Sequence, residues 1–185
     1  MLFRSRSTQL HAASWSELSF TAVLQAELAD LDGDDERCVA HLQESERLLQ
    51  RSGYQFTALF LYPLIVQRAL ARSDVDAARS ALDRWGAVAT RVPRVHHTLV
   101  ELRAGGPTSS ERDGLRPLPA SAGVGAGTGL VAQIAVAVHT GNRQLADASR
   151  ELLLSLAERG VDHVPSARRG VDAMLHELDG VDRAG

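Results

Sequence analysis

Helical hairpins are the feature that most limits how this chain can fold. From residue 64 to residue 93 the sequence reads LIVQRALARSDVDAARSALDRWGAVATRVP, an apolar run, a short polar turn and an alanine-rich run that ends before Pro93. Apolar residues recur at helical spacing on both sides of the turn, and Asp74 is a favourable N-cap for the second run. The stretch therefore predicts two helices joined by a tight turn.

The same pattern continues along most of the chain, and no segment alternates at period two for long enough to indicate a strand. We therefore expect an all-α fold of stacked antiparallel helix hairpins. Pro63 lies inside the third expected helix, where proline removes a backbone donor and clashes with the preceding turn, so we expect a kink or a break there. The apolar spacing predicts helices over 16–31, 35–51, 54–72, 74–91, 94–103, 130–139, 143–159 and 166–178.

A segment rich in glycine, proline and serine interrupts the helical pattern. It reads GGPTSSERDGLRPLPASAGVGAGTG over 105–129 and has no apolar periodicity, which is typical of a flexible linker or loop. We expect N-terminal hairpins over 1–104, a linker over 105–128, and a C-terminal hairpin with a terminal helix over 129–185. The stretch GVGAGTG lacks the glycine spacing of a dinucleotide fingerprint and follows no strand, so a linker is favoured over an anion site.

Composition excludes several classes of function. All 20 basic residues of this 185-residue chain are arginine, so the chain has neither a Schiff-base lysine nor a P-loop lysine. The single cysteine, Cys38, excludes an internal disulfide and a multi-cysteine zinc site and favours a reducing cytoplasm. The formal charge of −3 favours neither nucleic acid nor an anionic membrane, and no apolar run is long enough to span one.

Three expected turns have matching residues. A turn residue is followed four positions later by a small residue, and the pairs are Asp34 with Cys38, Asp74 with Ala78, and Asn142 with Ala146. The turns lie about 40 and about 68 residues apart, close to one and two lengths of a 34-residue repeat. A small residue at such a position lets two helices approach closely.

With these turns the chain resembles tetratricopeptide-type repeats over 16–93 and 129–165. In that motif a bulky apolar residue follows the small one and a proline often closes the unit. Leu82 and Pro93 match after Ala78, and Leu42 matches after Cys38, whereas Arg150 replaces the bulky residue of the last unit. The signature tryptophan and tyrosine of the first helix are missing from every unit. The resemblance implies a short α-solenoid that binds other proteins.

The arginine-, alanine- and leucine-rich hairpins also resemble the repeat regions of large actinobacterial regulators of the LuxR-type and AfsR-like classes. This resemblance implies a regulatory module that senses a partner or a ligand. The chain carries no nucleotide-binding motif and no recognisable DNA-binding helix-turn-helix. We expect a non-catalytic protein–protein interaction module without cofactor or metal, whose terminal apolar faces need a partner or a second copy. The alternatives are a sensor fragment of a transcriptional activator and a small-ligand-binding helical protein.

The candidate binding residues are arginines and one tryptophan. Arginines on and after the fourth expected helix suit an acidic peptide or phosphate, together with His96 and His97, although a solvated polar helix face explains them as well. Trp15 precedes the first expected helix and is a candidate anchor for a partner. The predicted binding residues are Arg79, Arg84, Arg91, Arg94 and Trp15.

Other chemistry-bearing residues have simpler interpretations. Adjacent His96 and His97 do not have metal-ligand spacing. The acidic cluster at 30–36 does not have the spacing of a calcium loop and is interpreted as a solvated turn with capping acids. Cys38 is expected to be a buried small residue at a helix contact rather than a nucleophile. We therefore expect no catalytic residue.

Overall fold

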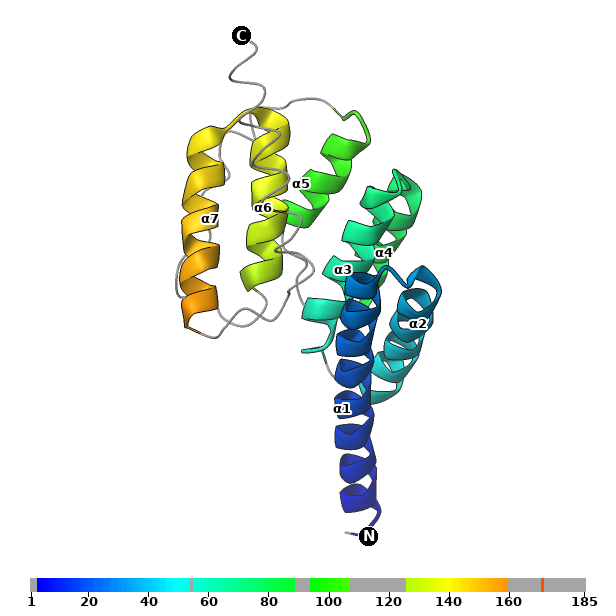
Figure 1. Ribbon diagram of the computed structural model, residues 1–185. Helices are drawn as coiled ribbons and strands as arrows, with labels where there is room; N and C mark the ends of the chain where they lie inside the picture. The colour runs from blue at the N-terminus through cyan, green and yellow to red at the C-terminus, as the bar shows by residue number, and fades with distance from the viewer. Residues whose placement is uncertain (1–2, 54, 89–93, 107–125, 160–170, 172–185) are drawn as a thin grey trace.

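The computed structural model describes the backbone of residues 3–53, 55–88, 94–106, 126–159 and 171, with side chains from residue 14 onward. This part of the chain contains seven α-helices and no strand, which confirms the all-α prediction (Figure 1). None of these helices is long and apolar enough to cross a membrane. The helices are α1 (Phe3–Asp32), α2 (Asp35–Ser52), α3 (Ala58–Ala71), α4 (Val75–Val88), α5 (Arg94–Arg103), α6 (Ala126–Thr140) and α7 (Arg143–Glu158).

Several expected bounds differ from the observed ones. Helix α1 begins at Phe3 rather than near residue 16, and α6 begins at Ala126, so the last residues of the expected linker are helical. Of the kink or break expected at Pro63, the break does not occur, because α3 continues through this residue. Pro63 is the sixth residue of α3, and its missing donor removes the helical hydrogen bond to the carbonyl of Leu59. Residues 89–93 and 107–125, and the expected last helix apart from Val171, lie outside the described residues.

The turns α1–α2, α3–α4 and α6–α7 share one geometry. The residue before each cap has a left-handed backbone, and these residues are Gly33 (φ 75°), Ser73 (φ 59°) and Gly141 (φ 67°). The backbone N–H of each cap donates to the carbonyl five residues earlier, at 2.8 Å for Asp34, 2.9 Å for Asp74 and 2.8 Å for Asn142. The side-chain oxygen of each cap accepts from the N–H three residues later, at 3.0, 2.9 and 3.1 Å. Local hydrogen bonds therefore define all three hairpins.

The small residues after the caps lie at helix contacts. Cys38, Ala78 and Ala146 are fully buried, as are the two serines that join α1 to α2. Ser19 Oγ donates to the carbonyl of Ser45, and Ser45 Oγ donates to the carbonyl of Ser19, each at 2.9 Å. These reciprocal bonds satisfy two buried hydroxyl groups, which would otherwise lower stability.

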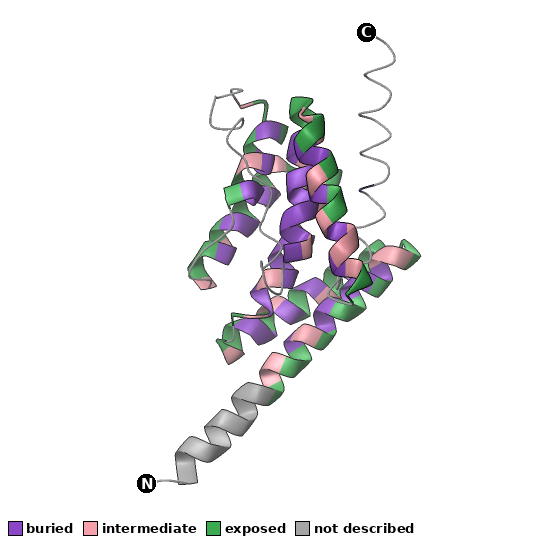
Figure 2. Ribbon diagram, turned by 90° about the vertical axis from the view of Figure 1, so that its left-hand side faces the viewer, coloured by how far each residue is buried: buried purple, intermediate pink, exposed green. Residues whose placement is uncertain are grey.

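One apolar core contains residues of all four helices from α1 to α4. Further apolar clusters join α5, α6 and α7. Val100 of α5 belongs to the first core, whereas Val95 and Leu99 of the same helix pack against α6. Helix α5 therefore connects the two parts of the molecule. Figure 2 shows buried residues along the inward faces of the helices, and in α1 from residue 14 onward it shows both buried and exposed residues.

Candidate functional site

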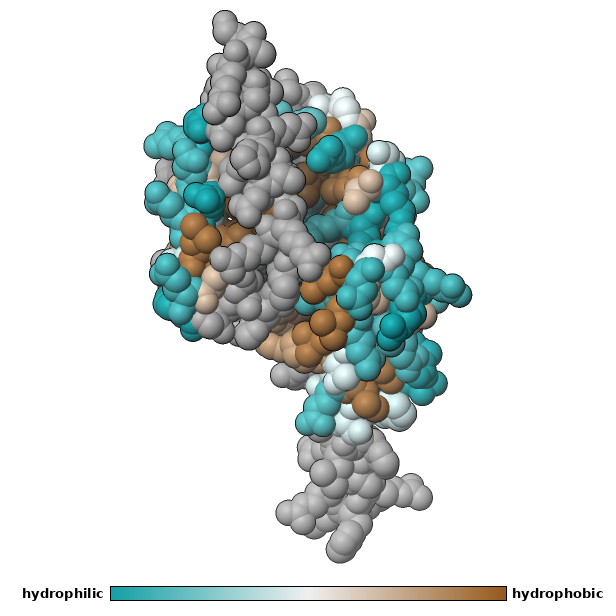
Figure 3. Space-filling model, viewed as in Figure 1, coloured by the Kyte–Doolittle hydropathy of each residue, from teal (hydrophilic) through white to brown (hydrophobic). Residues whose placement is uncertain are grey.

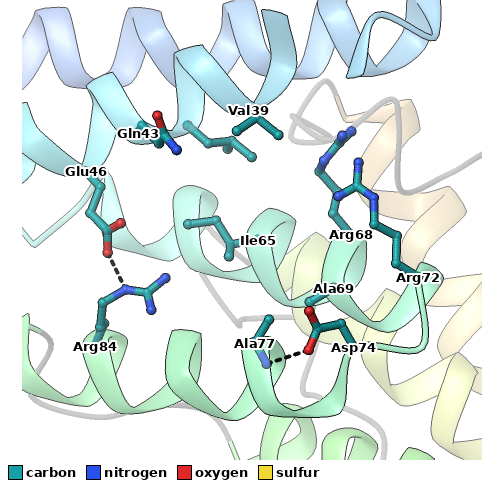
Figure 4. A pocket seen from close by; sticks show the side chains of 11 residues that line it. Val39, Gln43, Glu46, Ile65, Arg68, Ala69, Arg72, Asp74, Ala77 and Arg84 are labelled. Carbon is teal, nitrogen blue, oxygen red and sulfur yellow. Dashed lines mark hydrogen bonds and ion pairs between the residues drawn. The ribbon is translucent and has the colours of Figure 1, made fainter. Parts of the chain in front are cut away.

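A groove lies between α2 and α4, with α3 as its floor (Figure 4). It holds a volume of about 210 Å³, and its centre is apolar. Val39 on α2 is 38% exposed, and Ile65 and Ala77 are half-buried, so apolar side chains are accessible from solvent. The apolar lining residues are Val39, Leu42, Ile65, Ala69 and Ala77.

One end of the groove carries an ion pair between α2 and α4. Arg84 Nε donates to Glu46 Oε1 at 2.7 Å, and its Nη1 donates to Ser80 Oγ at 2.8 Å. The hydroxyl of Tyr62 donates to the same Glu46 oxygen at 3.0 Å. Burial and the carboxylate of Glu46 raise the pKa of Tyr62, so this hydroxyl stays a donor. Glu46 thus ties α3 and α4 to α2.

The opposite end carries two arginines that bind the α1–α2 turn. Arg68 is 9% exposed; it forms an ion pair with Asp30, and its Nη2 lies 2.6 Å from Asp35 Oδ1. Arg72 Nη2 lies 2.6 Å from Asp35 Oδ2. The acidic cluster was expected to be a solvated turn, and its Asp34 does cap α2, but two of its carboxylates bind the next hairpin. No local spacing in the sequence indicates these long-range pairs.

The predicted arginines that the structure describes have different surroundings. Arg84 lines the groove, whereas Arg79 on the same helix binds Glu101 of α5, with Nε and Nη2 at 3.1 and 3.2 Å from its two oxygens. Arg94 is exposed at the first turn of α5. Arg91 lies outside the described residues. Of these candidates, the structure places Arg84 alone in the groove lining.

Trp15 lies on α1 rather than before the first helix. It is half-buried, and the guanidinium of Arg51 on α2 lies 5.5 Å from the centre of its ring. This geometry is a cation–π contact that fastens α2 to α1. Trp15 does not line the groove.

His96 does not share a surface with the arginines, because it is fully buried. Its ring centre lies 5.1 Å from that of Trp85, and neither of its nitrogens has a hydrogen-bond partner among the described residues. Burial lowers the pKa of His96 from 6.5 to about 4, with a smaller contribution from His97. The expected grouping of arginines with both histidines is therefore wrong for His96, whereas His97 is exposed.

Cys38 is buried as predicted. Its side chain is fully inaccessible, and burial with the nearby Asp35 carboxylate raises its pKa to about 11. A thiol in this state is a weak nucleophile near neutral pH. Within the described part of the chain, no group of three or more histidine, cysteine or acidic side chains is placed to hold a metal ion.

Comparisons with protein-family models, curated proteins and solved structures find no match for the chain. The tetratricopeptide resemblance therefore stays a prediction based on the turn residues.

Proposed function

We propose that this chain is a non-catalytic protein–protein interaction module of tetratricopeptide-like hairpins, acting in bacterial regulation. The observation that carries the proposal is the groove, which combines an accessible apolar floor with a charged residue at each end. Repeat hairpins commonly bind peptides on such surfaces while their other faces remain in the core.

The groove suits a short peptide with an apolar residue between acidic ones. An apolar side chain would pack on Ile65 and Val39, which line the middle of the groove. Arg72 and Arg84 lie at opposite ends and are 46% and 41% exposed, so each can offer N–H donors to a carboxylate. Their partners Asp35 and Glu46 hold both guanidinium groups in position.

A matched pair of arginines on α4 tests this proposal. Arg84 lines the groove and Arg79 does not, yet both are partly exposed and both are ion-paired. We expect a protein captured from the lysate of the source organism by the wild-type chain to be lost with Arg84→Gln and retained with Arg79→Gln. Equal capture by both variants would refute the groove as the binding site.

A peptide measurement identifies the chemistry of the partner. We expect labelled peptides with an acidic–apolar–acidic pattern to bind the wild-type chain, as followed by fluorescence anisotropy, and peptides with reversed charges to bind weakly. Ile65→Glu should weaken binding of the acidic peptide, since it adds a negative charge to the apolar floor. Equal binding of both peptide classes would contradict the role of Arg72 and Arg84.

A further inference from the structure

Helix α5 holds the two parts of the molecule together with two faces of different chemistry. Figure 1 shows α5 between α6 on one side and α3 and α4 on the other. Toward α6 it presents Val95, Leu99 and Leu102, which form one apolar cluster with Ala132 and Val136 of α6. All of these side chains are aliphatic, so the contact between α5 and α6 does not respond to pH.

The face toward α4 contains side chains that titrate. His96 and Val100 lie one helical turn apart, with the His96 ring against Trp85 of α4 and Val100 in the core of α1 to α4. Beside them, Glu101 accepts hydrogen bonds from Arg79 of α4. We call Trp85, His96, Val100 and the Arg79–Glu101 pair the α5 joint. Acid acts on this contact and leaves the opposite face of α5 unchanged.

Three buried nitrogens of the α5 joint have no hydrogen-bond partner within the described part of the chain. They are the two ring nitrogens of His96 and the indole nitrogen of Trp85. By contrast, Figure 3 shows hydrophilic side chains exposed over α7 and α2, at the two outer edges of the view. A buried polar atom without a partner costs free energy that contact with water recovers. The joint is therefore easier to open than the aliphatic contact between α5 and α6.

Among the described residues, no carboxylate pairs with His96. Helices α3, α4 and α6 pack against α5. Their titratable or charged side chains are Tyr62, Arg68, Asp76, Arg79, Asp83, Arg84 and His139, and those of α5 itself, besides His96, are Arg94, His97, Glu101 and Arg103. The carboxylates in this set are exposed, and none of them binds the buried ring. A proton on His96 is therefore stable only where water reaches the ring.

We propose that mild acid opens the α5 joint, so that α5, α6 and α7 separate together from α1 to α4 while both parts keep their helices. Opening gives the His96 cation access to water and exposes the apolar side chains of Trp85 and Val100. At lower pH the carboxylate of Glu101 also takes up a proton, later than usual because its hydrogen bonds to Arg79 lower its pKa, and the ion pair is lost. The joint is thus a contact that acid releases in two steps.

The size of the first step follows from the pKa of His96, which burial lowers from 6.5 to about 4. The open state binds a proton below pH 6.5 that the closed state binds only near pH 4, so opening is favoured as the pH falls between these values. Between pH 7.5 and pH 5 the fraction of open molecules should rise about 30-fold.

Two buried valines report on the two faces of α5. Val100→Cys places a thiol in the α5 joint, and Val136→Cys places one in the contact between α5 and α6; both valines are buried. The natural Cys38, buried between α1 and α4, reports on unfolding of that part. Each thiol is labelled with N-ethylmaleimide and measured by peptide mass spectrometry, and its rate is divided by the rate in urea at the same pH. This ratio gives the fraction of molecules in which the thiol is accessible.

The accessible fraction of Val100→Cys should rise about 30-fold between pH 7.5 and pH 5, and at pH 5 it should exceed the fractions of Val136→Cys and Cys38 at least about 10-fold. His96→Phe should abolish the rise, since its ring takes up no proton, whereas His97→Gln should keep it. Far-UV circular dichroism should be unchanged at pH 5. The Tm at pH 7.5 shows that each variant folds, which we expect because valine and cysteine differ little in volume.

Equal accessible fractions for all three thiols at every pH would overturn the inference, because they would show that acid unfolds the whole chain at once. A rise that persists in His96→Phe would overturn it as well, and so would a Val100→Cys thiol that stays as protected at pH 5 as at pH 7.5. The measurement uses no peptide and none of these substitutions lines the groove, so its outcome is independent of the proposed function.

Discussion

Lowering the pH should destabilise this protein through one residue, His96. The side chain is fully buried against Trp85, and within the described part of the chain neither ring nitrogen has a hydrogen-bond partner. Charging the ring in the folded state therefore removes a cation from water without compensation. In the unfolded chain the same ring is solvated and accepts a proton at its ordinary pKa.

The sign and the size of the effect follow from the two pKa values. The pKa of His96 is about 4 in the folded state and about 6.5 when unperturbed. As the pH falls below 6.5, the unfolded state takes up a proton that the folded state does not, so stability is lost as the pH falls towards 4. At pH 5, which lies about 1.5 units below the unperturbed pKa of 6.5, proton uptake by the unfolded state lowers the free energy of unfolding by about 2 kcal/mol.

Urea unfolding at pH 7.5 and pH 5, followed by far-UV circular dichroism, measures this loss. We expect the wild-type chain to lose about 2 kcal/mol more between these pH values than His96→Phe, which keeps an aromatic ring beside Trp85. The exposed neighbour provides the control, since His97→Gln should keep the wild-type pH dependence. An equal loss in His96→Phe and the wild-type chain would refute the reasoning.

Three further predictions concern the turns and the buried polar groups. Ser73→Gly should raise the unfolding free energy by about 0.5–1 kcal/mol, because Ser73 has a positive φ, and Gly33→Ser should lower it at the equivalent position; both are measured by urea unfolding. Arg68→Ala should lower the free energy of unfolding by about 2 kcal/mol, because a buried side chain and two ion pairs are lost. Arg72→Ala should lower it by less than about 1 kcal/mol, because Arg72 is more exposed. Equal losses in the two variants would contradict the view that the buried arginine contributes more to stability. Cys38 should react with a thiol reagent at pH 8 only after denaturation, and rapid labelling of the folded chain would show that its side chain is accessible.

The hairpin turns could be predicted from the sequence, because each signal lies within a few residues of the structure it specifies. A capping side chain reaches the backbone three residues later, so Asp74 was predicted as a cap, and Asp34 and Asn142 were predicted as turn residues that the structure shows to be caps as well. The buried position of Cys38 followed from the same spacing. The equivalent residues of the other two turns are glycines, which favour a left-handed backbone. Ser73 adopts the same backbone, but a serine does not indicate it in the sequence.

The candidate site could be predicted only in part. Arg84 was predicted as a binding residue and lines the groove. The partner of each arginine on α4 depends on which helices lie beside α4, and the two faces of α4 contact different helices. Arg84 reaches Glu46 on α2, and Arg79 reaches Glu101 on α5. The apolar floor of the groove was missed, because Val39 and Ile65 belong to helices whose contact is not encoded in local spacing.

The sequence by itself determined the helical hairpins, their caps and the small residues at their crossings, since these depend on local hydrogen bonds and on the helical period. The tertiary structure alone decided that Arg68 binds Asp30 and Asp35, that His96 is buried beneath Trp85, and that the leucines of α1 are exposed. Apolar periodicity shows that a helix has a face to bury. It does not show which helix covers that face, because burial depends on neighbours that the chain brings together from distant positions.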